Sequence, residues 1–243
     1  MIGTKKICLW SGPRNISTAL MYSFAQRPDT IVFDEPLYGY YLKETIAKEY
    51  HPDAELVMHS MQCNGNQVID FMMGNFSSQV VFFKNMCHHL LELDRKFMND
   101  TINVILTRHP AQVITSFAKE IPNPSLLDIG IKTQAELLEE LIKENANVVV
   151  IDSHELLKSP ATYLSLLCDR LGIPFYENML TWEKGAKSYD GCWASHWYEN
   201  VHRSSGFQVY EEKSEVVPEH LSSLLHEALP HFLKLKQHSL QLD

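Results

Sequence analysis

The sequence lacks the features that would place this chain in a membrane or on a strongly anionic partner. Its 243 residues contain no apolar run near the roughly 18 residues that span a bilayer. They carry 21 basic and 30 acidic side chains, which gives a net charge of −9 with neutral histidines. Nucleic acids and anionic lipid surfaces select basic proteins, so we expect neither as a partner. An anionic ligand would need a local basic pocket.

Cysteine is scarce and scattered. The five cysteines stand at positions 8, 63, 87, 168 and 192, with wide and irregular spacing. Such spacing is typical of neither a disulfide framework nor a zinc motif, so no metal site is predicted. The first residues include two lysines but too few apolar residues for a signal-peptide core. We therefore expect a cytoplasmic protein.

Five short runs rich in β-branched and aromatic residues alternate with segments of helical periodicity. The predicted strands are residues 6–10, 30–34, 79–84, 103–107 and 147–152. Apolar residues at helical spacing follow in 16–24 and 137–142, and 154–171 is predicted to form one helix. This alternation predicts an α/β fold in which helices flank a central parallel sheet of about five strands.

No repeat, low-complexity tract or linker interrupts the chain, so residues 1–243 are predicted to form a single domain. Residues 38–75 are predicted to form an irregular helical cover over one mouth of the sheet, where substrates enter open α/β folds. An irregular aromatic segment, 175–206, precedes a predicted helix from Pro218 to about His238.

The most informative segment is WSGPRNIST at residues 10–18, which follows the first predicted strand and begins a helix. Backbone N–H groups at such a junction converge on one point and favour an anion. The nucleotide-hydrolysing loop GxxxxGKS/T is not present, because Ile16 and Ser17 replace its glycine and lysine. Arg14 is the candidate cation, beside the hydroxyls of Ser17 and Thr18. The alternative is a well-capped helix with a surface arginine.

This loop resembles the 5′-phosphosulfate loop of the sulfotransferase superfamily, which commonly reads PRSGTT where this chain has PRNIST at 13–18. The resemblance implies a P-loop-containing, sulfotransferase-like fold in which five residues bind the donor: Arg14, Asn15, Ile16, Ser17 and Thr18. Asn15 and Ile16 replace the usual Ser-Gly. Because isoleucine disfavours positive φ, Ile16 is not expected to take the backbone conformation open to glycine.

A second motif, VILTRHPAQVITSF at 104–117, strengthens the resemblance. A predicted strand ends near Arg108, and Ser116 stands eight residues later, about two turns into a helix. Members of the superfamily place an arginine and a serine at this separation to bind the donor's 3′-phosphate. The resemblance therefore assigns Arg108 and Ser116 to that phosphate. The alternative is an arginine at a sheet edge and a serine on an exposed helix face.

Sulfuryl transfer requires a base for the acceptor's proton and a cation for the charge that develops on the departing phosphate. Glu35 follows the second strand, where the resemblance implies a glutamate base. Lys84 ends the third strand, where cytosolic members carry a Lys-x-His motif with histidine as base. Met86 occupies that histidine's place, so His88, two positions later, is the second candidate. Salt-bridge or capping roles for Glu35 and a packed or surface role for His88 are the alternatives.

The segment at 195–207 resembles, more loosely, the basic loop that closes over the bound donor. This resemblance implies that Arg203 and Ser204 reach the 3′-phosphate, with nearby aromatic rings available to stack on adenine. Plain packing of the aromatic residues is the alternative.

Together the motifs imply a sulfotransferase that uses 3′-phosphoadenosine 5′-phosphosulfate (PAPS) as co-substrate, without a metal. The expected partner is a small-molecule acceptor that offers a hydroxyl or an amine. One alternative is a catalytically silent, nucleotide-binding regulatory module. A metabolite kinase is a less favoured alternative, because the Walker lysine is missing. Neither the acceptor's identity nor the oligomeric state follows from the sequence.

Overall fold

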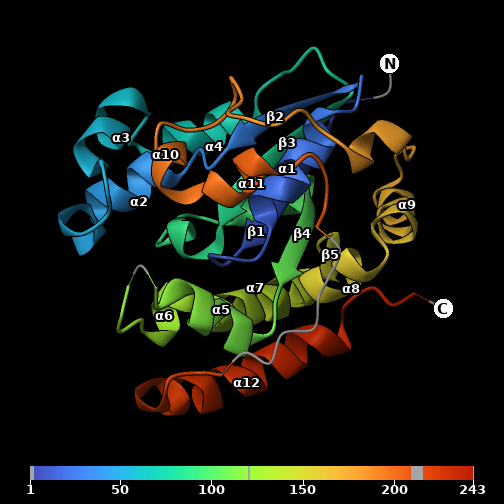
Figure 1. The fold of residues 1–243 in the computed structure, drawn as a ribbon. Coiled ribbons are helices and arrows are strands. Elements are labelled where there is room, and N and C mark those ends of the chain that lie inside the picture. The colour runs from blue at the N-terminus through green and yellow to red at the C-terminus, as the bar shows by residue number, and fades with distance from the viewer. Residues whose placement is uncertain (1–2, 120, 209–215, 243) are drawn as a thin grey trace.

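A parallel sheet of five strands forms the centre of the protein (Figure 1). The computed structural model describes residues 3–119, 121–208 and 216–242. Its strands are β1 (Lys5–Ser11), β2 (Thr30–Asp34), β3 (Val80–Met86), β4 (Ile102–Thr107) and β5 (Val148–Asp152). They lie in the order β2-β3-β1-β4-β5, and every neighbouring pair is parallel. The five predicted strands and the α/β class are confirmed.

Helices occupy most of the connections between and after the strands. The α-helices are α1 (Ser17–Ala25), α2 (Tyr38–Glu44), α3 (Ala54–Ser60), α4 (Gly65–Met73), α5 (Pro110–Phe117), α6 (Leu126–Ile129), α7 (Ile131–Lys143), α8 (Ser153–Lys158), α9 (Pro160–Leu171), α10 (Ala194–Trp197), α11 (Glu199–Arg203) and α12 (Ser222–Gln237). Short 3₁₀ turns are η1 (Ile46–Glu49), η2 (Cys87–Leu90), η3 (Lys96–Asp100), η4 (Glu177–Leu180) and η5 (Glu219–Leu221). Among the residues described, no helix is both long and apolar enough to span a membrane.

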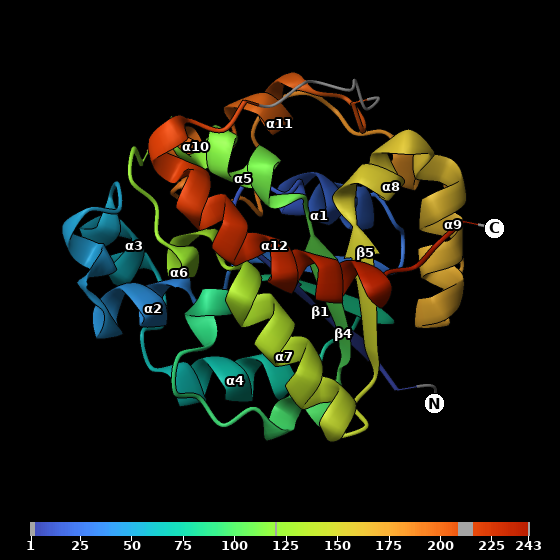
Figure 2. The same ribbon diagram turned by 90° about the horizontal axis from the view of Figure 1, so that it is seen from below.

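Alternating side chains on the strands divide the core between the two faces of the sheet. Cys8 and Trp10 of β1 pack with α4, α5, α7 and α12 on one face. Ile7 and Leu9 pack with α1 and α9 on the other. Figure 2 shows α12 lying across α7. Because both faces are covered, the strands are apolar throughout rather than alternating, as the sequence pattern indicated.

A third apolar cluster joins the predicted cover at 38–75 to the aromatic segment near 193–198. Tyr38 and Tyr41 of α2 pack there with Trp193 and Tyr198.

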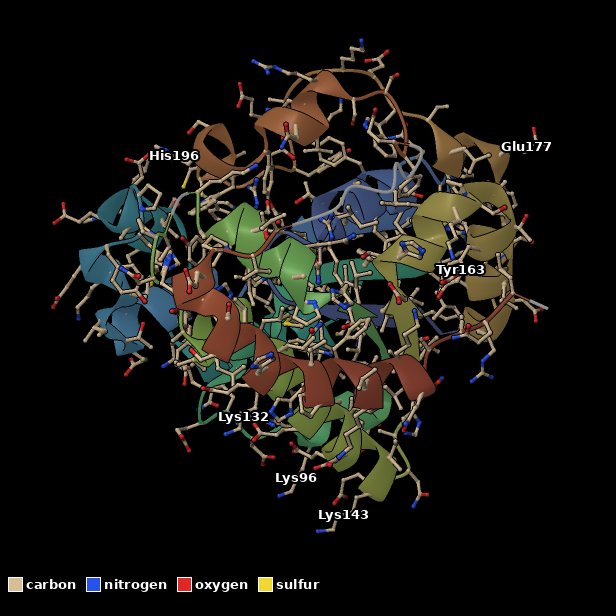
Figure 3. All side chains as sticks on the ribbon, turned by 60° about the horizontal axis from the view of Figure 1, so that its bottom comes forward. Lys96, Lys132, Lys143, Tyr163, Glu177 and His196 are labelled. Carbon is tan, nitrogen blue, oxygen red and sulfur yellow. The ribbon has the colours of Figure 1, made fainter. Side chains whose placement is uncertain are left out.

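The outer surface of η3 and α7 is polar and exposed. Lys96, Lys132 and Lys143 project from it into solvent (Figure 3).

One predicted helix forms two helices in the structure. The prediction of a single helix over 154–171 was wrong, because α8 ends at Lys158 and α9 begins at Pro160. Proline has no N–H to continue the first helix, and it keeps Ser159 out of helical geometry, at φ −147° and ψ 74°. Pro160 instead occupies the first turn of α9, where no intrahelical N–H bond is needed. The C-terminal helix is confirmed as α12.

A buried arginine joins the end of α1 to the segment after α9. The Arg27 side chain is fully buried, and its Nη2 lies 2.9 Å from the Asp29 carboxylate. Its Nε donates to Thr30 Oγ1 at 2.9 Å, and its Nη1 donates to the Pro174 carbonyl. The guanidinium also lies 5.0 Å from the centre of the Tyr176 ring. One cation thus fixes the packing of two distant chain segments beside β2.

We expect Arg27→Ala to lower the free energy of unfolding by about 3–5 kcal/mol, because it leaves buried acceptors without their charged donor. Urea denaturation measures the change. Arg95→Ala is the control: its pair with Glu140 is partly exposed, at 27% and 42% of the two side chains, so its loss should stay below about 1 kcal/mol. Similar losses in the two variants would contradict an anchoring role for Arg27.

Candidate active site

A cavity of about 330 Å³ lies where β1, β2, β3 and β4 end. Parallel strands bring the loops that follow them to one edge of the sheet, which is where open α/β folds bind ligands. All of the predicted site residues except Arg203 line this one cavity: Arg14, Asn15, Ile16, Ser17, Thr18, Glu35, Lys84, His88, Arg108, Ser116 and Ser204.

The loop between β1 and α1 takes a conformation that its sequence disfavours. Ile16 has φ 64° and ψ 14°, and Arg14 has φ 58°. The expectation that Ile16 avoids positive φ was therefore wrong. A tertiary contact fixes the loop: the buried Asn15 side chain donates from Nδ2 to the Leu106 carbonyl of β4 at 2.7 Å. Left-handed geometry at a β-branched residue is costly, so the surrounding structure must hold it in place.

This loop leads into a helix start that no side chain caps. Helix α1 begins at Ser17, and Ser17 and Thr18 both line the cavity. The first N–H groups of a helix have no intrahelical partner, and the helix dipole adds positive potential at that end. The β1–α1 loop and the first turn of α1 can therefore bind an anion through backbone N–H groups and two hydroxyls.

The two arginine motifs form one network. Arg14 Nε donates to Ser116 Oγ at 3.0 Å, so the first motif touches the serine of the second. Arg108 Nη1 donates to the Arg14 carbonyl at 2.7 Å, and its Nε donates to Gln112 Oε1 at 2.9 Å. Both guanidinium groups are half-buried at the cavity wall. The structure thus brings together three side chains that the sequence assigned to two separate phosphates.

A buried ammonium lies at the centre of the site. Lys84 Nζ is 2.9 Å from Asp34 Oδ1 and 2.5 Å from Glu35 Oε1. Asp34 and Lys84 are direct partners in the β2–β3 register, which places their side chains next to each other. Lys84 Nζ also donates to Tyr198 Oη at 2.6 Å, and this hydroxyl donates to Asp34 Oδ2 at 2.8 Å. Trp193 Nε1 donates to the same hydroxyl at 3.1 Å.

Burial and charge pairing set the protonation of this cluster. Burial raises the pKa of Glu35 above its ordinary value, while the Lys84 ammonium partly opposes that rise. Burial also opposes the charged form of Lys84, but the carboxylates of Asp34 and Glu35 outweigh it and hold the pKa of Lys84 well above its ordinary value. Lys84 is therefore an ammonium at neutral pH. Glu35 is a stronger base than a carboxylate at the surface.

The two histidines of η2 contact Tyr41 in different orientations. His89 is buried, with its ring stacked on Tyr38 and Tyr41 and its Nδ1 3.9 Å from Glu35 Oε2. His88 is half-buried, and its ring meets Tyr41 edge to face at 5.0 Å between centres. Burial lowers the pKa of His88 to about 4 and that of His89 well below its ordinary value. Both imidazoles are neutral near pH 7.

The structure separates the two residues predicted from the late basic loop. Ser204 lies in the cavity wall, where its Oγ accepts from Trp182 Nε1 at 3.1 Å. Arg203 does not line the cavity; its side chain is 75% exposed and pairs with Glu199 at 2.6 Å along α11. The ion pair between residues four apart holds Arg203 along the outer face of its helix.

Sequence reasoning missed three residues of the site: Asp34, Tyr198 and His89. The Asp-Glu pair at the end of β2 was a usable signal for Asp34, because two carboxylates at a buried strand end need a cation. Tyr198 gave no signal, since it lies 114 residues from Lys84 in the chain. His89 was visible beside His88, but nothing local separated their orientations. Within the described ranges, no cluster of three or more His, Cys, Asp or Glu side chains is arranged to hold a metal ion.

The family is decided by a match over nearly the whole chain, because a model of the sulfotransferase domain fits residues 5–239. The chain belongs to the sulfotransferase domain family. Two Arabidopsis thaliana proteins, branched-chain-amino-acid aminotransferase-like proteins 1 and 2, are 38% and 36% identical to it over 231 residues. The matched region is 94% of this chain but only 41% of each relative, so the chain spans about two fifths of their length.

Two solved sulfotransferase domains share the fold. The domain of the Synechococcus PCC 7002 olefin synthase superposes with a TM-score of 0.56 at 16% identity, covering 100% of this chain and 98% of that one. The domain from the curacin biosynthetic pathway gives 0.55 at 17% identity, covering 93% and 98%. At these identities the likeness concerns the fold alone, a five-stranded parallel sheet flanked by helices.

We expect Lys84→Met to destabilise the fold by about 3–5 kcal/mol near neutral pH, because two buried carboxylates lose their cation. The loss should shrink as pH falls. Without Lys84 the pKa of Glu35 in the folded protein rises further. A carboxyl group whose pKa is higher in the folded than in the unfolded chain destabilises the fold only above its unfolded pKa, which for glutamate is near 4.5. Urea denaturation at about pH 5 and pH 8 measures this difference.

The double variant Lys84→Met/Glu35→Gln is the control for this measurement. It removes one of the two unpaired carboxylates and should recover part of the lost stability at the higher pH. A loss that is independent of pH, and that the second substitution does not reduce, would mean that packing of the lysine stem rather than its charge supports the site.

Proposed function

We propose that this chain transfers a sulfuryl group from PAPS to the hydroxyl or amine of a small-molecule acceptor. One observation carries the proposal: a single cavity joins the Arg14–Arg108 network and the uncapped start of α1 to the buried Glu35–Lys84 pair. Anion-binding groups thus lie next to a base and a cation. Membership of the sulfotransferase domain family supports the reaction class.

The donor occupies the part of the cavity near β1 and β4. The N–H groups of the β1–α1 loop, with Ser17 and Thr18, hold the 5′-phosphosulfate, and Arg14 supplies a cation beside it. Arg108 and Ser116 hold the 3′-phosphate. Asn15 acts through the loop, because its amide is directed to the Leu106 carbonyl rather than to the ligand. Ser204 lines the same cavity, and Arg203, outside it, has no part in this assignment.

The reaction needs only groups that the cavity contains. The acceptor oxygen or nitrogen attacks sulfur in line and forms the new bond, while the bond from sulfur to the bridging phosphate oxygen breaks. The electron pair of that bond leaves with the 5′-phosphate, and the product nucleotide is adenosine 3′,5′-bisphosphate. Glu35 takes the acceptor's proton, and Lys84 both orients Glu35 and stabilises the developing negative charge.

A catalytically silent nucleotide-binding module would share the donor half of this site. The buried triad of Asp34, Glu35 and Lys84 favours catalysis, because three charges taken out of water are costly and a binding module does not need them. The kinase alternative lacks a loop lysine for the transferred phosphate, since Ser17 stands in its place. Nucleotide titration followed by a transfer assay separates the three functions.

We expect Arg108→Ala to weaken binding of adenosine 3′,5′-bisphosphate by roughly 1.5–3 kcal/mol, the worth of a hydrogen bond to a charged group. Binding of adenosine 5′-monophosphate should barely change, because it has no 3′-phosphate. Arg14→Ala should weaken both nucleotides similarly. Calorimetric titration at constant salt measures each affinity.

The exposed Arg203 provides the comparison for these variants, since Arg203→Ala should leave both affinities unchanged. Circular dichroism checks that each variant is folded. Equal losses for the two nucleotides in Arg108→Ala would show that Arg108 does not read the 3′-phosphate.

We expect Glu35→Gln to lower kcat by ~10²–10⁴ while the donor affinity stays nearly unchanged, since the amide keeps the shape and loses the basicity. His88→Ala should have a milder effect. Single-turnover transfer with radiolabelled PAPS measures the step directly. The reverse ranking of the two variants would move the base to His88.

A further inference from the structure

The two oxygens of Glu35 have different neighbours. Its Oε1 contacts the Lys84 ammonium at 2.5 Å, its carboxylate also interacts with the Tyr198 hydroxyl, and its Oε2 lies 3.9 Å from His89 Nδ1. Glu35 and His89 both line the cavity. Glu35 Oε2 therefore faces the edge of the His89 ring.

The aromatic neighbours of His89 fix the plane of its ring. The ring stacks on Tyr38, with 5.1 Å between centres and 3° between planes, and on Tyr41, with 4.5 Å and 26°. The Tyr38 hydroxyl in turn lies 2.7 Å from His51 Nδ1. In this plane Nδ1 is the ring nitrogen that faces Glu35.

The separation of His89 Nδ1 and Glu35 Oε2 allows one oxygen atom to hydrogen-bond to both. His89 is 1% exposed, and its Nδ1 has no hydrogen-bond partner among the described residues. A separation of 3.9 Å is too long for a direct hydrogen bond. An oxygen ~2.8 Å from both atoms lies about 2 Å to one side of the line that joins them, and there it satisfies a buried polar atom that is otherwise costly.

We infer that this position is the binding point of the acceptor's nucleophilic group and that it selects a hydroxyl, with His89 as a substrate-positioning residue. The inference rests on the proposed sulfuryl transfer. The hydroxyl donates its proton to Glu35 Oε2 and accepts a hydrogen bond from His89 Nδ1–H. Lys84 remains on the other oxygen of Glu35.

The selection follows from counting lone pairs. A hydroxyl oxygen has two: one accepts from His89 and the other attacks sulfur, while the O–H proton passes to Glu35. A neutral amine nitrogen has one lone pair, so it cannot accept from His89 and attack sulfur together. A protonated amine has none. His89 keeps its proton throughout, and the electron pair of the broken sulfur–oxygen bond leaves with the nucleotide's phosphate.

The neutral state of His89 is consistent with this role. Burial lowers the pKa of His89, and the neighbouring His88, His51 and Lys84 lower it further. A neutral imidazole carries one N–H, and the inference requires it on Nδ1. His88 Nδ1 is also buried without a hydrogen-bond partner among the described residues, but His88 forms no ion-pair contact with Glu35, so it does not offer the same position.

Three substitutions distinguish the contribution of the His89 ring from the contribution of its Nδ1 atom. His89→Phe keeps a stacked ring and removes the donor; His89→Asn loses the ring but carries an amide near the position of Nδ1. His89→Gln carries its amide near the position of Nε2. With benzyl alcohol as acceptor, we expect kcat/KM to fall about 10-fold or more in His89→Phe and His89→Gln, the worth of one hydrogen bond. His89→Asn should retain more activity than either, and adenosine 3′,5′-bisphosphate should bind all of them as it binds wild type.

Benzylamine is the matched acceptor, and His59→Phe on the exposed face of α3 is the matched histidine control. Wild type should turn over the alcohol faster than the amine, and His89→Phe should reduce that preference. Spectra of ¹⁵N-histidine-labelled wild type should show a protonated Nδ1 on His89, with a shift on addition of benzyl alcohol that Glu35→Gln alters.

The outcomes distinguish the inference from the proposed function. If wild type binds the bisphosphate but transfers sulfuryl to neither acceptor nor to a wider panel of alcohols and amines, the proposed function is wrong. If wild type transfers, the inference is overturned by any of four results. Three of them are a better rate with the amine, wild-type kinetics in both His89→Phe and His89→Gln, and an Nδ1 without a proton. The fourth is a drop in His89→Asn as large as that in His89→Phe, which would assign the effect to the ring rather than to the nitrogen.

Discussion

The site depends on one buried ammonium. Lys84 lies near the C-terminal end of β3, an interior strand of the sheet. Its Nζ contacts Asp34 and Glu35 at the end of the neighbouring β2 and Tyr198 on a distant segment. Burying these charges is costly, and only their close mutual contacts offset the cost. The same contacts fix which oxygen of Glu35 faces the cavity. Lys84 therefore determines both the orientation of the proposed base, Glu35, and the position of Tyr198 in the cavity wall.

Backbone strain gathers around this centre. Arg14, Ile16 and Glu35 all have positive φ, and each contributes to the cavity wall. Such conformations cost of order 1–3 kcal/mol each and persist where other contacts over-determine them. For Glu35 those contacts are the backbone bond from its N–H to the Lys84 carbonyl at 2.7 Å and the ion pair to the Lys84 side chain. For Ile16 they are the Asn15 anchor on β4 and the start of α1.

The division of the cavity is consistent with the proposed anionic donor in a protein with a net charge of −9. The local cations lie on the β1 and β4 side, where Arg14 and Arg108 are joined. Another part of the wall carries stacked tyrosine and neutral histidine rings. Burial keeps those histidines uncharged, so the part of the cavity that we propose for the acceptor gains no positive charge from them.

The sequence by itself determined the strands, the loops that follow them and a set of candidate residues of which all but Arg203 line the cavity. Buried parallel strands are continuous apolar runs, and the polar residues at their ends stand out against that background. The helix break at Pro160 could also have been predicted from the sequence, because a proline restricts the backbone of the residue before it wherever it occurs. These features are local, so a local pattern suffices to find them.

The tertiary structure alone decided which of those residues meet. Asp34 and Lys84 became partners through the strand order, and Tyr198 joined them from 114 residues away. Successive side chains in a 3₁₀ turn point about 120° apart, so one position in η2 separates His89 at Glu35 from His88 at the edge of Tyr41. Ile16 took a conformation against its intrinsic preference because Asn15 binds a strand 91 residues away. Contacts between distant segments outweigh local preference at all of these positions, and a sequence pattern contains no record of those contacts.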